Sequence, residues 1–209
     1  MGFFEPESMA TAAIFSSLRR RRSPSLEAFL APVDLSGVAV VQTLASISSE
    51  VVSSSAATRL SFQRRNARSL LRKIEIFVVL FEFLAEPRSP SSSTTALLCL
   101  KEFYLLIYRS KILLEYVAQS SNLWLLLQNP SISGYFHDLS QEISTLLDVF
   151  PVSELDLSDD IREQIELLRR QSLKSRLYID SNDESLRETF YSFLYTFENG
   201  EIPSPTALR

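Results

Sequence analysis

Residues 64–86 read RRNARSLLRKIEIFVVLFEFLAE, and this stretch decides the fold class. Its first half is polar on most sides, whereas the half from Ile74 to Leu84 is apolar nearly all the way round, interrupted by Glu75 and Glu82. A helix with one apolar stripe lies on a surface, but a helix that is apolar all round is enclosed by others. A membrane-spanning helix needs about 20 apolar residues, and this run is much shorter. We therefore expect the central helix of a soluble bundle.

The sequence on both sides of this stretch predicts an all-α protein. Apolar residues recur at helical spacing in several further segments, and polar or proline-containing segments separate them. We expect helices at residues 36–54, 60–86, 96–118, 129–150, 158–174 and 181–198. The prediction is a four-long-helix bundle with additional short helices at residues 34–200, after a basic, partly flexible lead-in at 1–33 and before a tail at 201–209.

Local signals mark where several helices begin. Asn129, which precedes a proline, and Ser158 are typical capping residues, and Ser181 with Glu184 forms a capping-box pattern. Residues 123–128, LWLLLQ, are too few for a helix of their own, so we expect an extended segment or a turn there. The predicted core residues are Val41, Leu44, Ile74, Phe77, Phe81, Leu100, Ile107, Leu139, Ile143, Ile165 and Leu168.

Composition excludes several classes of function. Of the 209 residues, 45% are hydrophobic and 22% are charged, which is typical of a globular protein that buries a core. The net charge of −4 does not suit a general nucleic-acid surface, so no nucleic-acid partner is expected. Four glycines disfavour glycine-rich phosphate loops, and one cysteine leaves no disulfide framework and no cysteine-based zinc cluster.

Few residues could carry chemistry. His137 is the only histidine and has no companion ligands at metal-binding spacing, so we assign it no metal or catalytic role. Cys99 lies among leucines and is interpreted as a small core residue. No phosphate-binding loop, kinase signature or identifiable serine–histidine–aspartate arrangement is present. We therefore predict no catalytic residue, no cofactor and no metal, and we interpret the chain as an interaction domain.

Two basic patterns are candidate contact surfaces. The first is an arginine run that comprises Arg19, Arg20, Arg21 and Arg22. Such a run can direct a protein to the nucleus or contact an anionic surface, and a solvated basic tail is the alternative. The second pattern is Arg64, Arg68 and Arg72, which are four residues apart and so share one helix face. Such a stripe is usually a solvated face, and a partner site is the alternative.

The tetrapeptide RSPS occurs twice, at residues 22–25 and 88–91, each time in a polar segment. Ser23 and Ser89 therefore precede proline, as the substrates of proline-directed kinases do, and are candidate phosphorylation sites. Chance recurrence in a serine-rich chain is the alternative. A phosphate adds about −1.5 to −2 charges at pH 7, so modification of Ser23 would offset much of the adjacent arginine run.

Three stretches resemble one known family. They are residues 9–41, MATAAIFSSLRRRRSPSLEAFLAPVDLSGVAVV, residues 122–147, NLWLLLQNPSISGYFHDLSQEISTLL, and residues 155–186, LDLSDDIREQIELLRRQSLKSRLYIDSNDESL. The second and third resemble the N-terminal domain of plant U-box ubiquitin ligases with armadillo repeats. The first resembles a subgroup of that family linked to defence and cell-death responses. The resemblance rests on helix patterns, not on catalytic signatures.

The resemblance implies a helical domain that docks protein regulators or substrates of ubiquitination, in the nucleus or the cytoplasm. In that family a U-box, which recruits the ubiquitin-conjugating enzyme, follows the helical domain, and armadillo repeats come next. We expect this chain to stop before the U-box and hence to be inactive alone as a ubiquitin ligase. The alternative is a membrane-associating four-helix bundle of a cell-death pathway, in which the arginines would contact anionic lipid.

Overall fold

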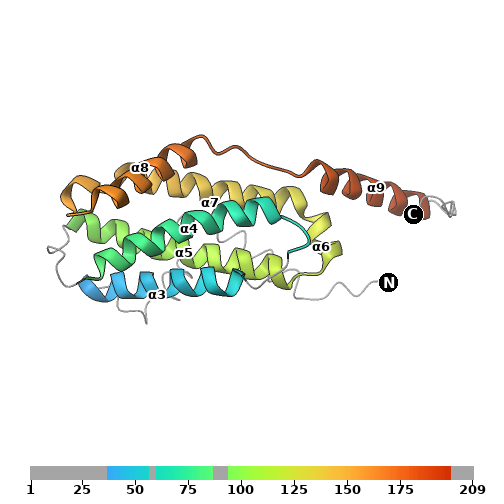
Figure 1. Cartoon of the computed structure of the whole chain (residues 1–209). Coiled ribbons are helices and arrows are strands. Elements are labelled where there is room, and N and C mark those ends of the chain that lie inside the picture. The colour runs from blue at the N-terminus through green and yellow to red at the C-terminus, as the bar shows by residue number, and fades with distance from the viewer. Residues whose placement is uncertain (1–36, 57–59, 87–93, 199–209) are drawn as a thin grey trace.

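The computed structural model describes residues 37–56, 60–86 and 94–198, and every regular element in these ranges is a helix (Figure 1). The α-helices are α3 (Gly37–Ala56), α4 (Arg64–Leu84), α5 (Thr94–Gln119), α6 (Asn122–Leu127), α7 (Asn129–Val149), α8 (Asp159–Leu173) and α9 (Ser181–Glu198). A 3-10 helix, η1 (Val152–Glu154), precedes α8. The all-α prediction is confirmed.

The long helices lie side by side and enclose a shared apolar core (Figure 1). Helix α3 packs against α4 and α5, and α7 packs against α5 and α8. Helix α4 also contacts α7 and α8, so it borders both sides of the bundle. Helix α9 extends past the end of the bundle next to α6 (Figure 1). None of the described helices is long and apolar enough to cross a lipid bilayer.

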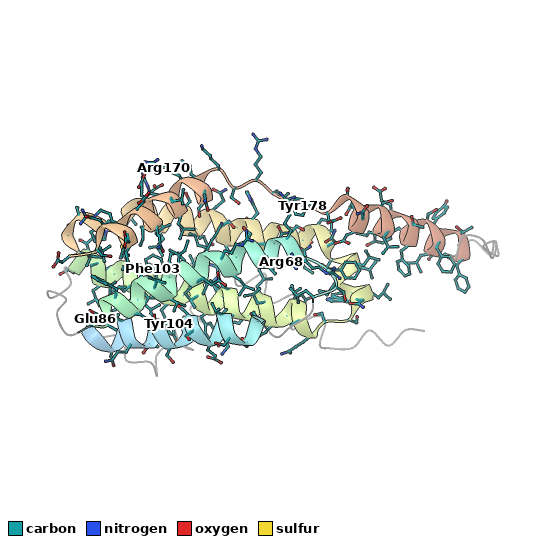
Figure 2. The ribbon with its side chains drawn as sticks, viewed as in Figure 1. Arg68, Glu86, Phe103, Tyr104, Arg170 and Tyr178 are labelled. Carbon is teal, nitrogen blue, oxygen red and sulfur yellow. The ribbon has the colours of Figure 1, made fainter. Side chains whose placement is uncertain are left out.

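The core is centred on aromatic side chains that α4 and α5 bring together. All eleven residues predicted to form the core are buried. Phe103 lies inside the bundle (Figure 2), with its ring centroid 4.9 Å from that of Phe77 and 5.5 Å from that of Phe81. Phe150, which follows α7, packs edge-on against the same ring at 5.3 Å. Edge-to-face packing of this kind adds to the stability that burial supplies.

The apolar half of α4 is not enclosed on every side, which corrects the expectation of a fully surrounded central helix. Glu75, Val79 and Glu82 are exposed, and Val79 is 43% exposed. These three positions are separated by four and three residues, so they form one outward strip. Periodicity identified the apolar run, but the apolar residue Val79 between the two glutamates gave no sign that this strip faces outward.

The start of α8 has the predicted cap, whereas the start of α7 does not. Ser158 Oγ accepts a hydrogen bond from the Ile161 N–H, with 3.4 Å between the two heavy atoms. Asn129 is the first residue of α7, not its cap, and its side-chain oxygen accepts a hydrogen bond from Gln63. The Asn129 side chain therefore binds Gln63, which is distant in the sequence, instead of capping the helix as the local sequence predicts.

The starts of α9 and α6 also differ from the expectations. Ser181 is the first residue of α9, and the carboxylate of Asp180 accepts a hydrogen bond from the Asn182 N–H at 2.9 Å. Residues 122–127 form the short helix α6, so the prediction of an extended segment or turn was wrong. Ser121 caps this helix by accepting a hydrogen bond from the Trp124 N–H at 3.3 Å.

Candidate functional site

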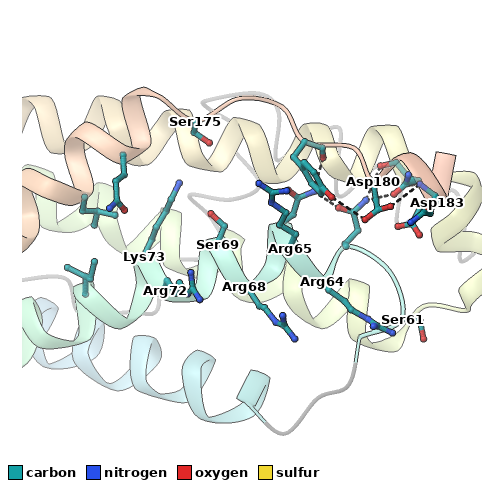
Figure 3. Close-up of a pocket in the computed structure, with 18 residues that line it drawn as sticks. Ser61, Arg64, Arg65, Arg68, Ser69, Arg72, Lys73, Ser175, Asp180 and Asp183 are labelled. Carbon is teal, nitrogen blue, oxygen red and sulfur yellow. Dashed lines mark hydrogen bonds between the residues drawn. The ribbon is translucent and has the colours of Figure 1, made fainter.

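A polar groove of about 730 Å³ lies between the first half of α4 and the segment 174–180 that links α8 to α9 (Figure 3). We call it the basic groove. Its charged lining residues are Arg64, Arg65, Arg68, Arg72, Lys73, Asp180 and Asp183. Five cations therefore face two carboxylates, in a chain whose net charge is −4. The groove is therefore positively charged, although the net charge of the whole chain is negative.

The sequence of α4 places these cations on the groove. Leu70 and Ala67 are buried and turn one side of the helix toward the core. The predicted stripe of Arg64, Arg68 and Arg72 is exposed and lies along the groove, as does Arg65. Figure 3 shows Arg65 and Lys73 rising from α4 toward the segment that links α8 to α9. The four-residue spacing did not identify Arg65 and Lys73, although each directly follows an arginine of the predicted stripe.

Tyr178 anchors the wall of the groove that lies opposite α4. The Arg65 guanidinium lies 4.2 Å from the centroid of the Tyr178 ring, which is a cation–π contact. Asn66 Nδ2 donates a hydrogen bond to the Tyr178 carbonyl oxygen at 3.0 Å. The Tyr178 hydroxyl donates to Asp180 Oδ2 at 3.1 Å. The hydrogen bond from the Asn182 N–H, followed by this one, holds the pKa of the Asp180 carboxyl below its usual value. These contacts fix the linking segment against α4.

A buried amide network closes one end of the groove. Gln63 Nε2 donates to Ser133 Oγ at 2.9 Å and also contacts the side chain and carbonyl oxygen of Asn129. Asn66 Nδ2 donates to Gln63 Oε1 at 2.7 Å. The backbone of Gln63 has a φ of 59°, a value uncommon for residues other than glycine. The network therefore holds the chain in an unfavourable backbone conformation at the point where α4 begins.

Lys73 is the unusual charged residue of the groove. Its side chain is only 6% exposed, and its Nζ has no hydrogen-bond partner among the described residues. Burial lowers the pKa of Lys73 from 10.5 to about 8. The ammonium is therefore still largely protonated at neutral pH, although it lies away from water without an acceptor.

Cys99 and His137 occupy separate environments. Cys99 is buried on α5, as predicted, and its thiol lies 3.8 Å from the Val149 carbonyl oxygen. Burial, followed by the nearby Glu102 carboxylate, raises the pKa of the thiol. His137 is half-buried on α7 and lines a smaller recess with Arg176. Within the described ranges, no group of three or more histidine, cysteine, aspartate and glutamate side chains could hold a metal ion.

Several candidate sites cannot be placed. The arginine run of residues 19–22 and the two serines, Ser23 and Ser89, lie outside the residues that the structure describes. Their roles as a contact patch and as phosphorylation sites therefore stay predictions.

A second surface feature was not expected from the sequence. Helix α9 has no buried residue, and its large apolar side chains stay in contact with solvent. We call the following residues the α9 apolar surface; they are between 40% and 71% exposed: Leu186, Tyr191, Leu194, Tyr195 and Phe197. Periodicity predicted the helix, but the sequence of α9 alone does not show that the described bundle leaves these side chains uncovered.

The chain is similar in sequence to known proteins over most of its length. The family model described as "PUB10-like, N-terminal domain" matches residues 64–175, which include α4 to α8. The chain is 74% identical to U-box domain-containing protein 17 of Arabidopsis thaliana over 96% of its length. It is 33% identical to U-box domain-containing protein 4 of Oryza sativa subsp. japonica over 91% of its length.

These relatives are much longer than the chain. The chain spans 30% of the Arabidopsis protein and 26% of the rice protein. A third relative, U-box domain-containing protein 16 of Arabidopsis thaliana, is 36% identical over 82% of the chain, which spans 26% of that protein. No solved structure matches the chain significantly.

Proposed function

Because the chain belongs to the PUB10-like N-terminal domain family of plant U-box proteins, we propose that it is a non-catalytic docking domain of a U-box ubiquitin-ligase system. It binds a protein that regulates ubiquitination or receives ubiquitin, in plant defence or stress signalling, in the nucleus or the cytoplasm. The observation that carries this proposal is the α9 apolar surface, which no described part of the bundle buries.

The chemistry of α9 specifies the kind of partner. Exposed apolar side chains gathered on one element of a folded protein mark interaction sites, and a helix that presents such side chains can bind in an apolar groove of its partner. The charged residues of α9 are Asp183, Glu184, Arg187, Glu188 and Glu198. Acidic side chains therefore predominate around the apolar ones. The partner that fits this helix is a protein with an apolar groove bordered by basic side chains.

A domain can assist ubiquitin transfer by docking alone, without a catalytic residue of its own. A U-box recruits the conjugating enzyme, and holding an acceptor protein beside it raises the rate by proximity. The chain itself needs no nucleophile for this role. Its one cysteine, Cys99, is buried with a raised pKa, and such a thiol is a poor nucleophile.

A comparison of ubiquitinated proteins tests the docking function. The chain joined to a U-box is produced in three forms: unchanged, with Leu186→Ser and Phe197→Ser on α9, and with the control changes Leu98→Ser and Leu167→Ser. The control leucines are 59% and 54% exposed on α5 and α8. Circular dichroism verifies that all three forms are folded, and mass spectrometry then identifies the modified proteins in a plant extract.

We expect the α9 changes to remove a set of modified proteins that the control changes retain. The rate of ubiquitin transfer to the fusion itself should be the same in all three forms, because the U-box supplies that activity. An identical set of modified proteins from the three forms would contradict docking through α9.

A membrane-associating bundle is the second candidate, and the exposed arginines of α4 favour it. Helices that lie on membranes combine a basic face and an apolar face. Here the basic residues line the groove on α4, whereas the α9 apolar surface lies on a separate helix that is mainly acidic. Flotation of the chain with liposomes that contain phosphatidylserine separates the two candidates, and we expect no flotation beyond that with neutral liposomes at physiological salt.

A further inference from the structure

The basic groove contains an ammonium group that lacks an acceptor. A lysine ammonium has three donors, and Lys73 Nζ satisfies none of them with a described residue. Buried charges in folded proteins are normally paired, because an isolated ion away from water is strongly disfavoured. Of the two carboxylates in the groove, Asp180 is already bonded to Tyr178 and to the Asn182 N–H, and the cation that acts on Asp183 is Arg64. The groove therefore holds a cation for which the described residues supply no counterion.

Guanidinium groups line the same groove as this ammonium. Arg68 and Arg72 line the same groove, and neither forms an ion pair with a residue that the structure describes. A guanidinium group matches the geometry of phosphate oxygens and can donate two parallel hydrogen bonds to them. The hydroxyls of Ser69 and Ser175 also line the groove and can donate. This donor set suits an anion with several oxygens.

The size of the groove indicates how many phosphates it can hold. Its volume of about 730 Å³ is within the range of small-molecule sites. A single inorganic phosphate would fill only a small part of it and would meet only some of the five cations. A molecule with several phosphate groups is large enough to extend from Lys73 to the arginines that line the groove.

We propose that the basic groove binds the phosphate groups of a multiply phosphorylated small molecule or headgroup, with Lys73 at its floor and Arg68 and Arg72 at its rim. The lysine stem has four rotatable bonds, so the ammonium can turn toward a bound phosphate. This site is independent of the α9 apolar surface, so its existence does not depend on the docking function.

Calorimetric titration of the 209-residue chain tests this proposal. The probes are inorganic phosphate, pyrophosphate and inositol hexakisphosphate, in chloride buffer at constant ionic strength. We expect affinity to increase with the number of phosphates. Lys73→Met should weaken binding of inositol hexakisphosphate at least about tenfold, because a charge-assisted hydrogen bond is lost. The double change Arg68→Gln and Arg72→Gln should weaken it by a similar factor.

Matched changes elsewhere control for general charge. Lys101→Met removes a half-buried lysine from α5, and Arg162→Gln with Arg170→Gln removes two exposed arginines from α8. These controls should bind the probe as the unchanged chain does. Equal weakening by groove and control changes would show general electrostatic attraction and would overturn the proposal. No binding of any of the three probes would also overturn it.

A second test uses the unchanged sequence, so its result does not depend on whether the substituted proteins fold. Reductive methylation with carbon-13 labels the lysines, and nuclear magnetic resonance then follows the pKa of each. Burial lowers the pKa of Lys73 to about 8 in the free chain. Inositol hexakisphosphate should raise it, because a nearby anion favours the charged ammonium. A pKa of Lys73 that does not change at saturating probe would contradict binding at this site.

Vesicles distinguish a lipid headgroup from a free phosphorylated molecule. Neutral phosphatidylcholine vesicles are compared with vesicles that also contain a phosphatidylinositol bisphosphate. The ligand is a lipid headgroup if the chain sediments only with the vesicles that contain the bisphosphate lipid. Inositol hexakisphosphate should then release the chain from these vesicles, and the Lys73→Met protein should not sediment with them. Binding of the soluble probe without sedimentation would identify a free molecule. Sedimentation that Lys73→Met leaves unchanged would place the contact outside the groove and overturn the proposal.

Discussion

Lys73→Met should stabilise the chain at neutral pH, because it removes a buried unpaired charge and leaves an unbranched apolar side chain in its place. The magnitude follows from the pKa of the lysine, which burial lowers from 10.5 to about 8. Each tenfold change in proton affinity corresponds to about 1.4 kcal/mol. The charged side chain therefore lowers the free energy of unfolding by roughly 3 kcal/mol, and the substitution should recover much of that amount.

The pH dependence of this gain has a definite sign. Below about pH 8 the lysine is protonated in both the folded and the unfolded chain, so the full penalty is present. Between about 8 and 10.5 the folded chain releases the proton while the unfolded chain retains it, so the unchanged chain becomes more stable as the pH rises. The advantage of Lys73→Met should therefore decline across this window and be small above it.

Urea denaturation followed by circular dichroism measures both effects. The free energy of unfolding is compared for the unchanged chain, Lys73→Met and the control Lys101→Met, in chloride buffers from neutral pH to above 10.5. The comparison of variants at each pH cancels the titration of the other groups. A loss of stability in Lys73→Met, or a difference that does not vary with pH, would refute this explanation of the buried ammonium.

Three further changes test the core, the amide network and the thiol. Phe81→Ala should lower the free energy of unfolding by about 3–5 kcal/mol, because its fully buried ring packs against Phe103; a loss under about 1 kcal/mol in urea denaturation would be inconsistent with this. Gln63→Ala should cost roughly 1–3 kcal/mol, since the buried Asn129 loses its donor. Gln63→Gly should cost less in the same assay, because glycine accepts a φ of 59°, and the reverse order would be evidence against backbone strain. Native Cys99 should react slowly with iodoacetamide at neutral pH and rapidly after unfolding, as mass spectrometry can follow; fast native labelling would mean that the thiol is accessible.

The apolar pattern of residues 64–86 was sufficient to predict the fold class, because hydrophobic periodicity is a property of the local sequence. Periodicity also identified buried core residues, such as Phe77 in this stretch and Ile143 in the helix predicted at 129–150. Capping was predicted less well. Asn129 has the local signature of a cap, but Gln63, which is 66 residues away in the sequence, takes its side chain. Contacts of this kind depend on how helices pack and cannot be obtained from one segment.

The candidate site was only partly predictable for the same reason. The spacing of Arg64, Arg68 and Arg72 identified one face of α4. It gave no sign that Lys73 is buried, because that depends on the position of α8 and of the segment that follows it. The exposed side of α9 depends likewise on what the bundle leaves uncovered. Sequence patterns identified the helices that carry both surfaces, and tertiary packing decided which of their residues are buried.

The central proposal is that this chain binds partners and does not itself transfer ubiquitin. Its most direct test incubates the purified chain with activating enzyme, conjugating enzyme, ubiquitin and ATP, beside a reaction without a ligase. We expect no ubiquitin chains above that control, and transfer only when the chain is joined to a U-box. Ubiquitin chains formed by the isolated chain would contradict the non-catalytic function, and their loss in Cys99→Ser would identify the thiol as the route.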